Sequence, residues 1–185
     1  MDVQVPMSDY GSHLTTRPKG IRDYGKVCER LDKVRPGEVV LLDFGGVEYV
    51  SASWITAMMV PLSRRAAEDD HDFFLIVNNF PTDSLDDLKL VADQNRVPFL
   101  LSVGKTKTRL IGTLDSGQQE TLRAVEELGE VTGAELAVKK PAMKTTGPAW
   151  NNRLRDLHEK RLLRRRKQGR EQIYKAVVPE VTIDG

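Results

Sequence analysis

Three short apolar runs in the first half of the chain constrain its fold more than any other feature. They span residues 39–42, 73–77 and 99–103, and the first follows the turn-like segment 35–37. Runs of this length that are rich in valine, leucine and phenylalanine are typical of strands buried on both faces. Between and before them, apolar residues recur at helical spacing. Strands that alternate with helices predict an α/β fold with a mostly parallel sheet.

The helices of the first half carry local start and stop signals. The first helix is expected to begin after Gly20, and the second to begin at Ser53 as its N-cap. Pro61 lies inside the second helix, so a kink or an early end is expected there. Ser84 and Asp87 are expected to cap a third helix.

The second half shows a different order of elements. Segments 116–119 and 132–135 each fit the capping box that begins a helix, and Gly129 is a fitting stop for the first of these helices. A third helix is expected to begin near 145–148, and a tight turn at 168–169 joins two strands. The second half is therefore predicted to be α+β, with a helix, a short helix, a third helix and a β-hairpin.

Charge divides the chain more sharply than its totals suggest. The sequence holds 28 basic and 27 acidic residues, a net charge of +1. Within 139–175, however, 13 basic residues stand against 3 acidic ones. Such a segment is either the solvated face of a helix or the footprint of a partner with a phosphate backbone. The order of elements around this segment favours the second interpretation, a partner with a phosphate backbone.

The changes in pattern and charge also place a domain boundary. Glycines and cations interrupt the apolar pattern near 105–113, where we expect a joint between two folded parts. The predicted domains are 1–108 and 109–180, and a short tail follows at 181–185.

The first domain resembles a known family in the segment that leads from its first apolar run into its second helix. This segment, residues 37–54, has the sequence GEVVLLDFGGVEYVSASW. It resembles the core of a STAS-like domain, a family named for sulfate transporters and anti-sigma factor antagonists. Segment 10–20 is similar to the entry of a STAS-like subfamily of poorly defined function. The resemblance covers about residues 3–105 and implies a domain for sensing, dimerisation or docking of a protein partner.

One position departs from the pattern of that family. In anti-sigma factor antagonists, the turn before this helix carries a serine that a partner kinase phosphorylates. The matching residue here is Ala52, which has no hydroxyl group, so the resemblance does not imply this phosphorylation switch. Ser51 and Ser53 flank it, and they are expected to cap the helix, with modification as the alternative.

The second domain resembles another family in its spacing. The segments 131–137, 149–164 and 169–174 follow the order of a winged helix-turn-helix domain. In that family the second helix of the motif enters the major groove of duplex DNA. The resemblance implies that the helix starting near 145–148 contacts DNA. Trp150 is in register with Leu154 and Leu157, so we expect it to anchor the core rather than to stack on a base.

Side-chain chemistry suggests a role for each polar residue of this region. The polar face of the third helix lies opposite its apolar stripe, Trp150, Leu154 and Leu157. Asparagine pairs well with adenine, and arginine with guanine, in the major groove. The residues expected to read bases are Asn151, Asn152 and Arg155. Hydroxyl groups and cations at the helix start and the hairpin tip suit phosphates. The residues expected to hold phosphates are Lys144, Thr145, Thr146, Lys167 and Arg170.

The sequence offers little support for catalysis. Segment 103–106 resembles the end of a phosphate-binding P-loop, but the position that must be glycine is Phe99. The single cysteine, Cys28, excludes an internal disulfide bond and a multi-cysteine metal site. The acidic segment 68–72 has no second cluster of metal ligands to complete it. We therefore expect no enzyme activity, no cofactor and no metal.

Two functions remain open. The first is a transcriptional regulator that binds double-stranded DNA as a homodimer and senses a signal through its STAS-like domain. The second is a partner-switching adaptor whose STAS-like domain binds a kinase or a sigma-control protein. The basic segment favours the first. No apolar run approaches the roughly 20 residues that span a bilayer, and the N-terminus lacks a secretory pattern, so a cytoplasmic protein without a membrane partner is expected.

Overall fold

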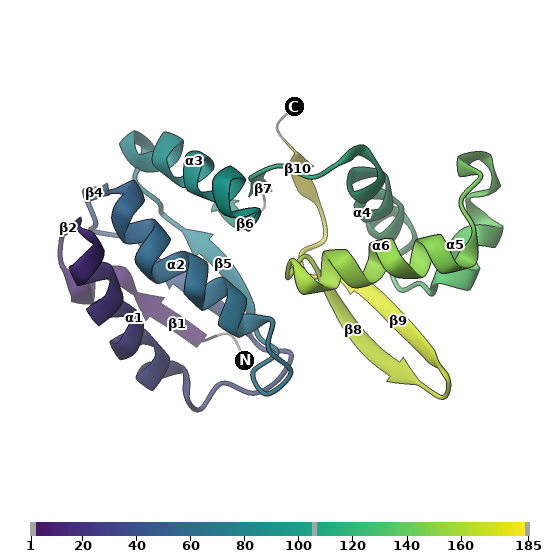
Figure 1. Ribbon diagram of the computed structural model, residues 1–185, viewed down its shortest axis with the longest axis horizontal. Helices are drawn as coiled ribbons and strands as arrows, with labels where there is room; N and C mark the ends of the chain where they lie inside the picture. Colours follow the sequence, from purple (N-terminus) through teal and green to yellow (C-terminus); the bar gives the residue numbers. More distant parts are fainter. Residues whose placement is uncertain (1–2, 105–106, 184–185) are drawn as a thin grey trace. The chain divides into compact units, whose positions relative to one another are not determined.

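The chain forms two compact units. The computed structural model describes residues 3–104 and 107–183. The first unit comprises residues 1–113 together with 181–185, and the second comprises 114–180 (Figure 1). The chain therefore passes from the first unit into the second and back again.

Both ends of the second predicted domain differ from the expectation. The predicted boundary at 108/109 falls inside strand β7 (Lys107–Ile111), which belongs to the sheet of the first unit. The predicted tail contributes strand β10 (Val181–Ile183), which pairs in parallel with β7. Its remaining residues, 184–185, lie outside the described residues. Both segments pair with neighbouring strands of the sheet. The sequence does not indicate this, because β7 begins with polar residues and β10 is short.

The first unit is built on a six-stranded sheet in the order β1-β3-β5-β6-β7-β10. Neighbouring strands are parallel except β6 and β7, which are antiparallel. The predicted α/β fold with a mostly parallel sheet is therefore confirmed. The remaining strands of this sheet are β1 (Val3–Pro6), β3 (Val39–Asp43), β5 (Phe74–Asn78) and β6 (Phe99–Val103). A separate parallel pair consists of β2 (His13–Leu14) and β4 (Tyr49–Val50).

The three predicted apolar runs form β3, β5 and β6, which lie next to one another inside the sheet. Each strand lies within one residue of its predicted bounds. Val40, Leu42 and Val77 from these strands are fully buried in the core of the unit. Short apolar runs were thus a reliable signal for interior strands.

Helices α1 (Arg17–Leu31), α2 (Ala52–Ala66) and α3 (Leu85–Asn95) cover one face of this sheet (Figure 1). Strands β1, β3, β5 and β6 follow the same order in the chain and in space. Strand–helix–strand connections between parallel strands are right-handed in nearly all proteins. Successive right-handed connections that advance in one direction place their helices on the same face.

Of the two serines expected to cap α2, Ser51 does so and Ser53 does not, and a third residue, Asp87, also contributes to the cap. The Oγ atom of Ser51 accepts a bond from the backbone nitrogen three residues later at 3.3 Å, so Ser51 is the N-cap. Ser53 lies in the first turn instead, with its Oγ atom 3.1 Å from Oγ of Ser51. The carboxylate of Asp87 accepts a bond from the backbone nitrogen of Ala52 at 3.1 Å. Ser84 makes no side-chain cap for α3, so the predicted Ser84–Asp87 pair is wrong: Asp87 caps α2.

Helix α2 also continues beyond its proline. Pro61 lies inside the helix, which ends at Ala66, so the predicted early end is wrong. A proline inside a helix removes one backbone bond and costs about 3 kcal/mol. Val60 and Leu62 on either side are buried, and this packing offsets the cost of the proline.

Helix α1 begins earlier than predicted, because Thr16 caps it and Arg17 is its first residue. Gly20 lies within the helix at its contact with α2. A Cβ atom on Gly20 would lie 3.0 Å from the carbonyl oxygen of Trp54 and 2.8 Å from Cβ of Ala57. The glycine therefore serves the close approach of two helices and does not start α1.

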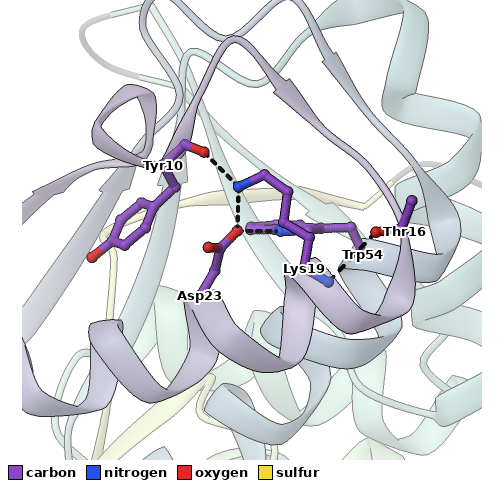
Figure 2. Close-up of polar contacts among 5 residues, drawn as sticks. All are labelled: Tyr10, Thr16, Lys19, Asp23 and Trp54. Atoms are coloured by element: carbon purple, nitrogen blue, oxygen red, sulfur yellow. Dashed lines mark hydrogen bonds and ion pairs between the residues drawn. The ribbon is translucent and has the colours of Figure 1, made fainter.

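A buried polar network joins α1, α2 and the 3₁₀ helix η1 (Met7–Tyr10), as Figure 2 shows. Asp23 is 3% exposed, and its carboxylate accepts a bond from Nε1 of Trp54 at 2.8 Å and one from Nζ of Lys19 at 2.9 Å. Nζ of Lys19 also donates to the carbonyl oxygen of Tyr10 at 2.5 Å. The buried carboxylate thus has the charged and neutral donors that its burial requires.

The second unit consists of helices followed by a β-hairpin, in the predicted order. Gly169, with a φ of +61°, lies in the turn between the two antiparallel strands. The elements are α4 (Ser116–Leu128), α5 (Gly133–Lys139), the 3₁₀ helix η3 (Pro141–Met143), α6 (Gly147–Glu159), β8 (Leu163–Gln168) and β9 (Glu171–Ala176).

Both of the first two helices begin with a capping box. The box of α5 joins Thr132 and Glu135, as predicted. The box of α4 joins Asp115 and Gln118, one residue earlier than predicted. Aspartate is as good an N-cap as serine, so a capping box could begin at Asp115 or at Ser116. The structure uses the box that begins at Asp115.

The core of the second unit contains the predicted apolar stripe of α6. Trp150, Leu154 and Leu157 are fully buried, so the prediction that Trp150 belongs to the core is confirmed. The guanidinium of Arg153 lies over the ring of Trp150, 5.6 Å from its centre, and within 4 Å of the carboxylate of Glu120 on α4. Burial of this stripe fixes the rotation of α6 and so decides which residues face solvent.

Candidate nucleic-acid interface

The exposed face of α6 carries the polar residues that its period predicts. Asn151, Asn152 and Arg155 are exposed on the side opposite the apolar stripe. The helix begins at Gly147, and the Oγ1 atom of Thr146 accepts a bond from the third backbone nitrogen of the helix at 3.4 Å. The three candidate base-reading residues therefore occupy the first three turns of α6.

These residues line a groove between α6 and the hairpin, which we call the basic groove. It encloses about 340 Å³ and holds three arginines against one carboxylate. Its lining residues are Thr132, Asn151, Asn152, Arg155, Arg165, Arg170, Glu171, Gln172 and Tyr174. The groove brings together amide groups, which suit base edges, and guanidinium groups, which suit phosphates or guanine.

The two faces of the hairpin carry different cations. Arg165 lies opposite Tyr174 in the register of β8 and β9, and it lines the basic groove. Its neighbours Arg164 and Arg166 point to the other face because side chains alternate along a strand. There, Nη2 of Arg166 donates to Oε2 of Glu130 at 2.8 Å. One of the three consecutive arginines therefore faces the groove, and another is held by an acid.

Two ionisable groups of the hairpin region reflect these contacts. Burial raises the pKa of the Tyr174 hydroxyl, and the charge and hydrogen bond of Arg165 offset part of the rise. The hydroxyl is therefore protonated at neutral pH and can donate a hydrogen bond within the groove. The hydrogen bond and charge of Arg166 lower the pKa of Glu130, which keeps this carboxylate ionised on the far face.

Other predicted phosphate-binding residues lie outside the groove lining. Lys144 follows η3 in a left-handed conformation with a φ of +49° and is exposed. Thr145 donates its hydroxyl to the carbonyl oxygen of Met143 at 3.1 Å, and Thr146 is the N-cap of α6. Lys167 is exposed near the hairpin tip. Of the predicted phosphate contacts, Arg170 is the one that the structure brings to the groove.

Some groove residues were missed by the sequence reasoning. Arg165, Gln172 and Tyr174 reach the groove because the hairpin register turns them toward α6. Side chains alternate along a strand, so Gln172, two residues before Tyr174 in β9, could have been identified from the sequence. Arg165 lies on the other strand, and its place follows from the register of the hairpin. Thr132 was recognised as a cap, but its place beside Asn151 depends on how α5 packs on α6.

One close approach between α5 and α6 positions the first groove residue. A Cβ atom on Gly133 would overlap the side-chain amide of Asn151 and would lie 3.1 Å from its backbone nitrogen. Glycine at this position therefore lets the N-termini of α5 and α6 meet, and the amide of Asn151 lies over it.

Replacing Gly133 with alanine is expected to destabilise the second unit by roughly 1–3 kcal/mol, because the new methyl group overpacks this contact. The same substitution in an Asn151→Ala background is expected to cost less, since the overlapping amide is gone. Urea unfolding of the four variants of this cycle measures both values. Gly25→Ala is the control: nothing lies within 4 Å of its Cβ position on α1, so a gain of about 0.5–1 kcal/mol is expected. An equal penalty in both backgrounds would contradict the steric explanation.

Among the described residues, no group of three or more His, Cys, Asp or Glu side chains is arranged to hold a metal ion. No helix in the described ranges is both long enough and apolar enough to cross a membrane. Comparison with known proteins yields no match: no family model, no curated protein and no solved structure matches this chain. The fold and the basic groove are therefore the observations from which a function can be inferred.

Proposed function

We propose that the second unit is a winged helix-turn-helix domain that binds double-stranded DNA, and that the protein is a transcriptional regulator rather than an enzyme. In this proposal α5 and α6 form the helix-turn-helix, and the hairpin β8–β9 is the wing. The observation that carries the proposal is the basic groove, where amides on the exposed face of α6 lie beside arginines of the hairpin.

The proposed docking follows from the chemistry of the groove. α6 enters the major groove, and Asn151, Asn152 and Arg155 face the base edges. Arg165 and Arg170 hold the phosphates that border the groove, and Lys144 and Lys167 extend the basic surface on either side. The concentration of cations in 139–175 supports this arrangement, because neutralised phosphates release counterions and so stabilise the complex.

The first unit has a supporting role in this proposal. Its α/β sheet and its likeness in sequence to STAS-like domains suggest sensing, dimerisation or docking of a protein partner. Ser51 remains a candidate for modification, although its hydroxyl caps α2, and Ser53 lies beside it. A regulator of this kind works in the cytoplasm, where it meets DNA.

Replacing Arg165 with alanine is expected to weaken binding to all duplexes alike, because the lost contact is to the DNA backbone. The slope of log affinity against log salt concentration should flatten by about 0.9, the value for one phosphate contact. Binding of the full-length protein to a duplex pool at several salt concentrations measures this slope.

Arg166→Ala is the matched control, because Arg166 is the next residue of the same strand and faces away from the groove. Its guanidinium is bound to Glu130, so the slope should stay at its wild-type value. Equal effects of the two substitutions would mean that the groove is not the DNA-binding surface. Absence of salt-dependent binding to any duplex would sink the proposal and favour the partner-switching adaptor.

The proposal includes a homodimer. A single winged helix contacts few base pairs, and two-fold symmetry doubles the site. Sedimentation of the full-length protein at tens of micromolar is expected to show a dimer. A monomer with and without duplex DNA would contradict this expectation.

A further inference from the structure

The polar side chains of α6 differ in which of their hydrogen-bonding atoms remain available. Nη2 of Arg155 donates to Oδ1 of Asn152 at 3.3 Å. On its other side, Nε of Arg155 lies 3.9 Å from Oε1 of Glu159. The guanidinium is therefore held along the helix between an amide oxygen and a carboxylate. This bond directs the oxygen of Asn152 toward Arg155, so the amide nitrogen is the end of the side chain that faces away from Arg155 and is offered to a ligand.

The amide of Asn151 is turned in a similar way. Its Oδ1 atom is the atom nearest to the Cβ position of Gly133, so the oxygen end of the amide faces α5. The nitrogen end is then the part of Asn151 directed away from Gly133. The three polar side chains on this face of α6 thus present hydrogen-bond donors.

A surface of donors selects among the bases. In the major groove, guanine offers two acceptors, N7 and O6, whereas adenine offers the acceptor N7 and a donor at N6. Paired recognition of adenine by asparagine requires the amide oxygen to accept from N6. In Asn152 the bond to Arg155 directs that oxygen along the helix and takes one of its two lone pairs, which favours the amide nitrogen as the group that meets a base. The guanidinium has five N–H groups, so Arg155 can hold Asn152 and still donate to a guanine.

We propose that Asn152 and Arg155 act as one reading unit that selects guanine at two adjacent positions, and that Arg155 sets the base preference of Asn152. This inference rests on the proposed function, and it differs from the simple expectation that asparagine here pairs with adenine. Arg155 is therefore a positioning residue for Asn152 as well as a base contact in its own right.

The test is selection of preferred sequences from a randomised duplex pool by the full-length protein and two variants. Asn152→Ala is expected to lose its preference at one position, which identifies the base that Asn152 reads. Wild type is expected to prefer guanine at this position. At the adjacent position it should prefer guanine by roughly 5- to 150-fold over other bases, the range of the bidentate contact that Arg155 can make.

Arg155→Ala gives the decisive result. It should lose the guanine preference at its own position and, because it frees the oxygen of Asn152, should change the neighbouring preference from guanine to adenine. Both side chains are exposed, so neither substitution removes core packing. The indole signal of Trp150 serves as the check that the unit is folded.

The inference and the proposed function fail differently. A wild-type preference for adenine at the Asn152 position, or an unchanged preference there in Arg155→Ala, would overturn the inference while duplex binding still stands. If wild type shows no salt-dependent binding to any duplex, the proposed function fails, and this inference fails with it.

Discussion

Replacing Asp23 with alanine is expected to lower the free energy of unfolding of the first unit by about 3–5 kcal/mol, the range for breaking a buried ion pair. The substitution removes the acceptor of the indole N–H of Trp54 and the counter-charge of Lys19. The side chains of Asp23 and Lys19 are 5% and 24% exposed, so water replaces the lost contacts poorly. Urea unfolding followed through the indole N–H signal of Trp54 measures the change.

Asp9→Ala is the matched control for this substitution. Asp9 also pairs with an α1 cation, Arg30, at 2.8 Å, but the two side chains are 54% and 41% exposed. Its loss is expected to change stability by about 0–1 kcal/mol. If Asp23→Ala has no larger effect than Asp9→Ala, the buried network does not stabilise the unit.

Leu154→Ala is expected to lower the free energy of unfolding of the second unit by about 2–5 kcal/mol. Leu154 is fully buried on α6, and its truncation leaves a cavity in a small core. The indole signal of Trp150, in the same core, should disappear at lower urea concentration, while that of Trp54 should keep its midpoint. Salt-dependent duplex binding should be lost at the urea concentrations at which the second unit is unfolded.

Val138→Ala provides the comparison within the same unit. Val138 lies on α5 and is 78% exposed, so its truncation should change stability by about 0.5 kcal/mol at most. A joint shift of the Trp54 and Trp150 signals in Leu154→Ala would show that the two units unfold as one body.

The parts of the fold that carry a strong local pattern could be predicted from the sequence. Strands β3, β5 and β6 are contiguous apolar runs, and the capping box of α5 is complete within four residues. Strands β1, β7 and β10 carry no such pattern, because their conformation depends on distant partners. Val181, for example, pairs with Thr108, and the whole second unit separates these two residues in the sequence. Strand preference of this kind reflects tertiary context more than local sequence.

Helix boundaries failed where tertiary contacts outweigh local rules. Pro61 should end α2 by local chemistry, but burial of its neighbours carries the helix to Ala66. Asp87 appeared to be a local cap, yet its carboxylate bonds to the backbone of another helix, at Ala52. In both cases the prediction considered only the helix that contains the residue and left out its contacts with the rest of the unit.

In the candidate site, too, some residues follow from local sequence and others depend on tertiary structure. The exposed residues of α6 follow from the helical period, since burial of Trp150 fixes the rotation of the helix. The hairpin residues of the groove depend on register instead. A shift of one residue in β8 would bring Arg164 and Arg166 to the groove in place of Arg165. The sequence of three consecutive arginines cannot by itself choose between these alternatives.

The return of the chain to the first unit also determines the order in which the protein can be completed on the ribosome. Residues 114–180 are synthesised before strand β10, so the second unit can fold while β7 is still an open edge of the sheet. Open edges invite pairing with other chains, and charged side chains on the strand, such as Lys107 and Arg109, reduce that hazard. While translation passes through the second unit, the edge of β7 is therefore available for pairing with other nascent chains.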